Sequence, residues 1–358
     1  MVQFLARPWD HGKEFGQNLA DVLSGYEQKL RDGERRIAKC SRGERLDEAA
    51  AIGGREAFQY VKAADVQGQP YAGSDLGTAA VLEEHRVLWG GLWRDGEETG
   101  AGDAGWLSCL PPDVPCRRIA AEQLRASAAA FAADTSCSDG APAKGFGNLS
   151  LQMLEALADL GLLWEAAGRW PSRESVAMTV MIPKGTSSGE RPITLFRSAI
   201  RVMARAKARA AAQWLDEHSP PHLNAARGRR VGDAMWRTQL RALLSESRGL
   251  QSAEVQLDLH KAFELVDRGK LIEAAAAAGY PCDVLACGLS MYGWARRIVF
   301  RGCVTRTMRP VRGIAAGSAF ATTELWVLLC DAIGRLTRRF PRVQWCLHVD
   351  DLSGPARA

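Results

Sequence analysis

Hydrophobic and polar positions follow two different periods along this chain, and the two periods predict both helices and strands. Apolar residues at helical spacing predict helices over 81–93, 149–167, 198–215 and the segment after 318. Short β-branched or apolar runs predict strands over 176–182, 191–195 and 255–259, and a hairpin over 297–308. Together these elements indicate an α+β fold.

The same pattern suggests three regions, which are residues 1–110, 111–250 and 251–358. The first is expected to be mainly helical and partly disordered, with an amphipathic series from Phe15 to Leu30. Trp89 and Trp93 stand four residues apart in it, and aromatic residues at that spacing are expected to pack into a core. Glycine-rich or mixed polar stretches at 99–105 and 136–147 predict loops.

Composition bounds the class of protein. The chain has 358 residues, of which 47% are hydrophobic, enough for several lobes with real cores. Nine cysteines occur without a CxxC pair, so neither a zinc site nor a disulfide framework is indicated, and a reduced, intracellular setting in nucleus or cytoplasm is expected. No secretory signal or membrane-spanning run is present in the sequence, so no membrane partner is expected.

Positive charge is concentrated in the middle of the chain. The net charge is +5, yet residues 184–248 hold 13 Lys or Arg against 5 Asp or Glu. Four arginines recur at every fourth position and would form one stripe on a helix, namely Arg197, Arg201, Arg205 and Arg209. Such a stripe suits a phosphate backbone, and the alternative is a merely solvated helix face.

Three aspartates end two strand-like runs. Asp350 and Asp351 close the apolar run that begins at Trp345, and Asp258 ends the run that begins at Val255. Adjacent carboxylates repel each other, so an apolar strand that brings them to one point usually needs a cation there. Three such acids suit a two-metal phosphoryl-transfer site with two Mg²⁺ ions, or Mn²⁺ in their place. The alternative is a helix N-cap at Asp258 and a plain turn at Asp350-Asp351.

Five short motifs in this order resemble the fingers and palm of reverse transcriptases, most of all those of non-LTR retrotransposons and group II introns. The motifs are Ile182-Pro183-Lys184, Arg191-Pro192-Ile193, Asp258-Leu259-His260-Lys261-Ala262-Phe263, Gly317-Ser318 and Val349-Asp350-Asp351. The resemblance covers roughly residues 161–352. It implies a right-hand polymerase with a small antiparallel palm sheet packed on helices, after a mainly helical N-terminal region.

The resemblance also implies a role for each matching residue. Asp258 and Asp350 would hold the two Mg²⁺ ions, with Asp351 supporting the site. Lys184 and Arg191 would contact the triphosphate of the incoming dNTP, since a guanidinium binds phosphate oxygens in pairs. Phe263 would block a ribose 2′-hydroxyl, and its alternative is a core phenylalanine. Gly317-Ser318 would grip the RNA template, which pairs with a DNA primer.

Two departures from the family weaken the expected activity. Ala316 and Thr322 stand where relatives carry glutamine and proline, which removes a polar contact to substrate and template. Asp351 is followed by only seven residues, so we expect the strand behind it to be cut short and the thumb to be absent.

The leading hypothesis is an RNA-directed DNA polymerase domain of a retroelement. One alternative is an inactive, truncated remnant that only binds nucleic acid. Another is a nucleotide cyclase with a palm fold, which the motifs at Lys184, Arg191 and Gly317 disfavour.

Overall fold

The computed structural model describes most of the chain from Gly77 onward. The described residues are 77–95, 116–135, 137–167, 170–171, 174–183, 190–224, 229, 231–249 and 252–357. The chain divides into two compact units, and nearly all described residues belong to the unit formed by Gly77–Met181 and Pro192–Ala358. The expected helix from Phe15 to Leu30 and the expected loop at 99–105 lie outside the described residues.

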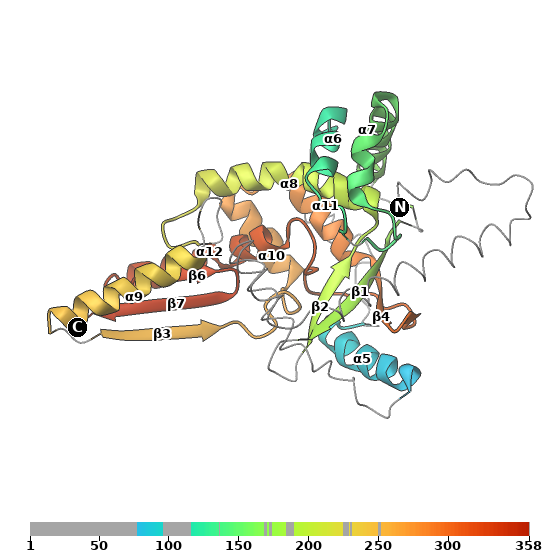
Figure 1. The fold of residues 1–358 in the computed structure, drawn as a ribbon. Helices are drawn as coiled ribbons and strands as arrows, with labels where there is room; N and C mark the ends of the chain where they lie inside the picture. Colours follow the sequence, from blue (N-terminus) through green and yellow to red (C-terminus); the bar gives the residue numbers. More distant parts are fainter. Residues whose placement is uncertain are drawn as a thin grey trace, which may run out of the picture. The chain divides into compact units, whose positions relative to one another are not determined.

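Helices and small sheets together make an α+β fold. The helices are α5 (Thr78–Trp93), α6 (Ala121–Ala129), η2 (Ala143–Asn148), α7 (Leu151–Ala166), α8 (Ser198–His218), α9 (Val231–Ser247), α10 (Arg268–Ala278), α11 (Cys282–Gly293) and α12 (Ala321–Arg339) (Figure 1). Within the described ranges, no helix is long and apolar enough to cross a membrane.

One sheet has four strands in the order β2-β1-β4-β5. They are β2 (Glu190–Leu195), β1 (Val176–Pro183), β4 (Ala295–Phe300) and β5 (Cys303–Val304). β1 runs parallel to β4, and β4 turns back into β5 through Arg301-Gly302, both at positive φ. The predicted turn at these two residues is therefore confirmed. A glycine at such a turn adopts positive φ without steric cost.

Helix α5 packs against β4 of this sheet. Trp89 and Trp93 are each only 1% exposed and share a small core with Leu82, Ile298 and Met308. The expectation that the two tryptophans face a core is confirmed.

The second sheet has three antiparallel strands in the order β3-β7-β6. They are β3 (Ser252–Asp258), β7 (Asp351–Arg357) and β6 (Cys346–His348). All seven residues of β7 pair with all seven of β3. The expectation of a cut-short strand after Asp351 is thus wrong, because Leu352 to Arg357 form a full strand rather than a tail. Pro355 is tolerated there because β6 pairs only as far as Ser353.

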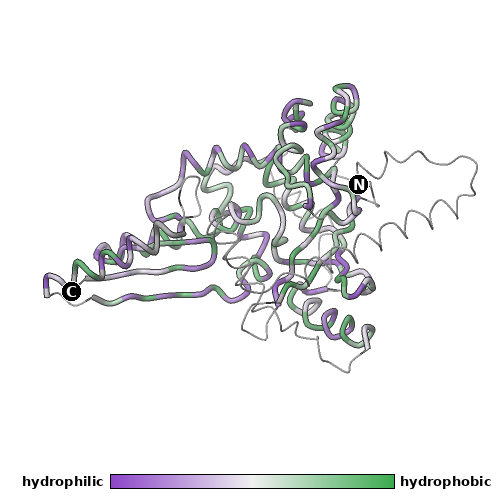
Figure 2. Tube along the Cα trace, viewed as in Figure 1, coloured by the Kyte–Doolittle hydropathy of each residue, from purple (hydrophilic) through white to green (hydrophobic). Residues whose placement is uncertain are grey.

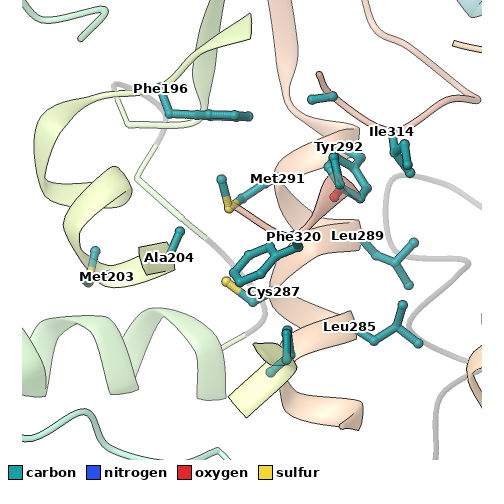
Figure 3. Packing of buried hydrophobic residues seen from close by; sticks show 14 of the residues in the cluster. Phe196, Met203, Ala204, Leu285, Cys287, Leu289, Met291, Tyr292, Ile314 and Phe320 are labelled. Atoms are coloured by element: carbon teal, nitrogen blue, oxygen red, sulfur yellow. The ribbon is translucent and has the colours of Figure 1, made fainter. Parts of the chain in front are cut away.

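The main core lies between the helices. α8 buries the apolar side predicted for it, including Ile200, Met203, Ala211 and Trp214, while hydrophilic positions recur along the rest of the helix (Figure 2). Figure 3 shows part of this core, where side chains of α8, α11 and the segment before α12 meet. Leu325 of α12 is buried in it. α10 ends with Gly279 in a left-handed cap.

Candidate active site

The three-stranded sheet brings two of the three predicted aspartates together. Asp258 is the last residue of β3 and Asp351 the first of β7, and the two are direct partners in the antiparallel register. Partners in such a ladder have Cα atoms about 4.5–5.5 Å apart. Both side chains are exposed. Two like charges in this position repel each other, so the arrangement costs stability unless a cation lies between them.

Asp350 lies in the two-residue turn that joins β6 to β7. His348 pairs with Asp351, so Val349 and Asp350 form the loop of a tight hairpin. Val349 has φ 60°, the sign that two-residue hairpin loops require at their first position. Glycine, asparagine or aspartate usually occupies such a position, and a β-branched residue there is strained. Backbone strain of this kind tends to be kept where it serves a site.

A cavity of about 720 Å³ opens on the face of the sheet that carries these acids. Residues of β3, β6 and β7 line it together with two polar residues of α9, which lies alongside the sheet (Figure 1). The polar lining residues are Thr238, Gln239, Glu254, Gln256, Asp258, Cys346, His348, Asp351 and Ser353. The cavity is large enough for a nucleotide-sized ligand.

The sequence reasoning missed most of this lining. Glu254, Gln256 and Ser353 have the same strand parity as Asp258 and Asp351, so period-2 alternation places them on one face. That signal was available once the register was known. Thr238 and Gln239 carry no such signal, since their position depends on how α9 packs.

The metal ligands remain a prediction. Among the described residues, no group of three or more His, Cys, Asp or Glu side chains lies close enough together to hold an ion. The register pairs two carboxylates directly and leaves the third, Asp350, in the turn.

The Gly317-Ser318 turn is held by β2. The Thr194 N–H donates to the Ala316 carbonyl oxygen over 2.7 Å, and Gly317 has φ 104°. A Cβ on Gly317 would collide with the Thr194 carbonyl oxygen. The sequence reasoning attributed this glycine to close approach of a nucleotide, whereas the close approach in the structure is to the β2 backbone.

Phe263 lies in the loop after β3, half-buried against the main core. Its carbonyl oxygen accepts the Ile314 N–H over 2.8 Å, which ties the loop to the segment before Gly317. Lys261 of the same loop has φ 49° and places its ammonium 4.1 Å from the centre of the Trp89 ring. A cation over an aromatic face is stabilising, so α5 helps to fix the loop. The contact between Lys261 and Trp89 had no sequence signal.

The arginine stripe of α8 is partly engaged within the protein. Arg197 pairs with Glu174 over 3.1 Å, and Arg201 and Arg205 lie over the Phe131 ring. Of the four arginines, Arg209 is exposed and the other three are half-buried. Arg201, Arg205 and Phe131 also line a cavity of about 290 Å³, which reaches Gly317 and Ala319. The stripe is therefore less uniform than the spacing predicts.

Of the two predicted fingers residues, Arg191 lies within the described residues. Lys184 lies outside the described residues. Arg191 is exposed on β2, in the segment 182–191 that belongs to the other compact unit. Their contact with a triphosphate remains a prediction.

Comparisons with known proteins assign no family to this chain. No family model matches it, and no curated protein matches it. Among solved structures, apo telomerase from Candida tropicalis truncated from its C-terminal domain has a TM-score of 0.39 and 10% identity, covering 62% of this chain and 52% of that one. Apo telomerase from Candida tropicalis has the same score and identity, covering 58% and 44%. The chain thus spans about half the length of these structures.

Proposed function

We propose that this chain is a nucleotidyltransferase of the reverse-transcriptase type, which adds deoxynucleotides to a DNA primer paired with an RNA template. In this proposal the β3-β7-β6 sheet is the palm and the β1-β2 pair belongs to the fingers. The observation that carries it is the register of Asp258 opposite Asp351 beside the polar cavity.

The residues present suit Mg²⁺. Asp258 and Asp351 offer exposed carboxylate oxygens on neighbouring strands, and hard oxygen ligands are those that Mg²⁺ prefers. Asp350 would complete the set after a small movement of the hairpin turn. When bound, such ions lower the pKa of an attacking hydroxyl and neutralise charge on the leaving pyrophosphate.

The protein's own residues would do the positioning. The carboxylates hold charge at the end of the cavity, where the primer 3′-hydroxyl and the triphosphate must meet. Phe263 limits the space beside the ribose, and Arg191 with Lys184 would bind phosphate oxygens. Ser318 offers a hydroxyl at the turn tied to β2. Holding the reacting groups in this geometry supplies much of the rate enhancement in phosphoryl transfer.

The test is primer extension with a matched control. Purified protein is given a primed RNA template, dNTPs and Mg²⁺, and we expect extended products. Asp258→Asn should lower the extension rate by at least about 10³-fold, since it removes a carboxylate ligand of the ion that would activate the attacking hydroxyl. The control Glu273→Gln changes an exposed acid on α10 and should extend like the wild type. Equal rates for wild type and Asp258→Asn would overturn the proposal.

A second candidate is binding of nucleic acid without catalysis. It is favoured by the finding that the described acids form a pair and not a closed group of three. This candidate expects salt-dependent binding of RNA and no extension with either Mg²⁺ or Mn²⁺. The same assay therefore separates the two candidates.

A further inference from the structure

One edge of the three-stranded sheet is open. β3 is an outer strand in the order β3-β7-β6, and all seven of its residues pair with β7 on one side. Among the described residues no strand pairs with its other side, and residues 253–258 are all exposed. An outer strand of this kind presents a row of backbone N–H and C=O groups to which a further strand can bind.

The opposite edge of the same sheet is covered. The Leu347 N–H of β6 donates to the His222 carbonyl oxygen, and the Asn224 N–H donates to the Leu347 carbonyl oxygen, both over 2.8 Å. Proteins usually protect outer strands by such cover, by short length, or by proline, lysine or a bulge. β3 has none of these devices, since it is seven residues long, contains neither proline nor lysine, and pairs with β7 without interruption. Its charged residues are Glu254 and Asp258.

Apolar side chains are exposed on β3 and on the helix beside it. Val255 is 49% exposed and Leu257 is 47% exposed. α9 contacts β3 and carries four more exposed apolar residues at helical spacing, namely Trp236, Leu240, Leu243 and Leu244. Apolar residues left exposed beside an open strand edge are typical of a surface that binds another protein.

Symmetry limits how β3 could pair with β3 of a second copy. Opposed residues of an antiparallel pair point to the same face of the sheet, and successive residues alternate between faces. The two-fold axis must therefore pass beside a residue that opposes its own copy. Axes at Glu254 and Gln256 pair five residues each, 252–256 and 254–258, whereas an axis at Val255 pairs all seven.

The charges of β3 distinguish these three registers. An axis at Glu254 sets that carboxylate against its own copy, and an axis at Gln256 sets Glu254 against Asp258 on both sides. Like charges directly opposed are destabilising. An axis at Val255 instead opposes Glu254 to the amide of Gln256. It also opposes Asp258 to the uncharged Ser252, so the longest register is the one that opposes no like charges.

We propose that β3 pairs antiparallel with β3 of a second copy of this chain, with the two-fold axis at Val255, so that the two sheets join into one. Within the strand the Gln256 amide donates to the Glu254 carboxylate over 3.3 Å, and the same two groups can bond across the axis. A specific interface buries about 800 Å² per partner, and the exposed apolar residues of α9 are available for the area that one strand edge does not supply. This interface does not depend on the proposed nucleotidyl transfer.

The test is sedimentation of the full chain without nucleic acid, over protein concentrations from about 1 to 100 µM. Wild type should change from monomer to dimer within this range. Val255→Lys and Val255→Glu each set two like charges against each other at the axis, so each should weaken the dimer by at least about tenfold. An equal mixture of these two variants should form a dimer again, because lysine then opposes glutamate.

Matched controls separate this register from a general effect of surface charge. Val87→Lys changes a valine of α5 that is 59% exposed, and it should form a dimer like the wild type. Leu257 opposes Ala253 in the proposed register and not its own copy, so mixing Leu257→Lys with Leu257→Glu should restore nothing. Urea unfolding checks that each variant is folded. A wild type that stays monomeric would leave the edge to a strand of another protein and overturn self-pairing, as would a mixture of the two Val255 variants that stays monomeric.

Discussion

Two turns with positive φ hold or adjoin predicted site residues of this molecule, and they are built in opposite ways. The hairpin turn at Val349-Asp350 places a strained, β-branched residue where glycine would fit, and the acids beside it are exposed. The turn at Gly317-Ser318 has glycine where no other residue fits, and the acid behind it is buried. An exposed acid pair keeps its charge available for a cation, whereas a buried acid without a cation is driven to neutrality.

The difference shows how acidic side chains behave in two environments, one exposed and one buried. Asp258 and Asp351 repel each other across two strands, and a bound cation would relieve that repulsion. Glu324 is buried and hydrogen-bonded to Tyr292, whose hydroxyl lies 3.4 Å from Ser318 Oγ. Substitutions at each turn can test this contrast between the two turns.

The largest effect expected at a single fixed pH is that of Gly317→Ala. The added methyl group would collide with the Thr194 carbonyl oxygen, at a backbone φ of 104° that alanine disfavours. We expect the free energy of unfolding to fall by about 3 kcal/mol, from steric and conformational terms together. Urea unfolding measures it. Gly293→Ala is the control, since a Cβ there meets nothing within 4 Å. If both variants lose the same stability, β2 does not hold the turn.

The next effect is the pH dependence of Glu324→Gln. Burial raises the pKa of Glu324 in the folded protein to about 8, from the ordinary value of 4.5 that it has in an unfolded chain. Between these values the folded state holds a proton that the unfolded state has released. Wild-type stability should therefore fall as pH rises from about 4.5 to 8, by about 1.4 kcal/mol per pH unit. Above pH 8 the contribution becomes constant.

Glu324→Gln should lack this slope, so its stability relative to wild type should rise with pH up to about 8. Thermal or urea unfolding at pH 5.5, 6.5 and 7.5 measures the difference. The control Glu273→Gln removes an exposed charge and should stay within about 0.5 kcal/mol of wild type throughout. Parallel curves for wild type and Glu324→Gln would mean that the buried carboxyl is already ionised.

Much of the fold was predictable from the sequence because its signals are local. Helical periodicity located α7, α8 and α12, and Gly279 marked the end of α10. The strand β7 was misjudged, because only seven residues follow Asp351 and they were expected to be too few for a full strand. Its formation depends on pairing with β3, almost a hundred residues earlier, and local propensity does not register a partner so distant.

The pairing of two predicted site residues could be foreseen from the sequence, whereas the contacts around them could not. The grouping of Asp258 with Asp351 followed from motif order, and the register agrees with it. Glu324 and Tyr292 gave no signal, because a glutamate near the start of a helix usually faces solvent and favours the helix dipole. In the structure this one lies inward, hydrogen-bonded to Tyr292 and close to Gly288 of α11. The predicted contacts of Lys184, Arg191 and the arginine stripe with nucleic acid remain predictions.

The smallest effect separates strain from packing at the hairpin turn. Val349→Ala keeps a Cβ at φ 60° and removes the branched side chain, while Val349→Gly removes the Cβ as well. A variant with glycine is ordinarily less stable than one with alanine, because glycine gives the unfolded chain more conformational entropy. At this position the order should reverse, with Val349→Gly more stable than Val349→Ala by about 1 kcal/mol, because alanine pays the left-handed penalty. Urea unfolding of the two variants measures the difference. If Val349→Ala is the more stable, the valine is not strained. If the order reverses and Val349→Gly also extends primers more slowly, the strain serves to hold Asp350 and Asp351 in place for a cation.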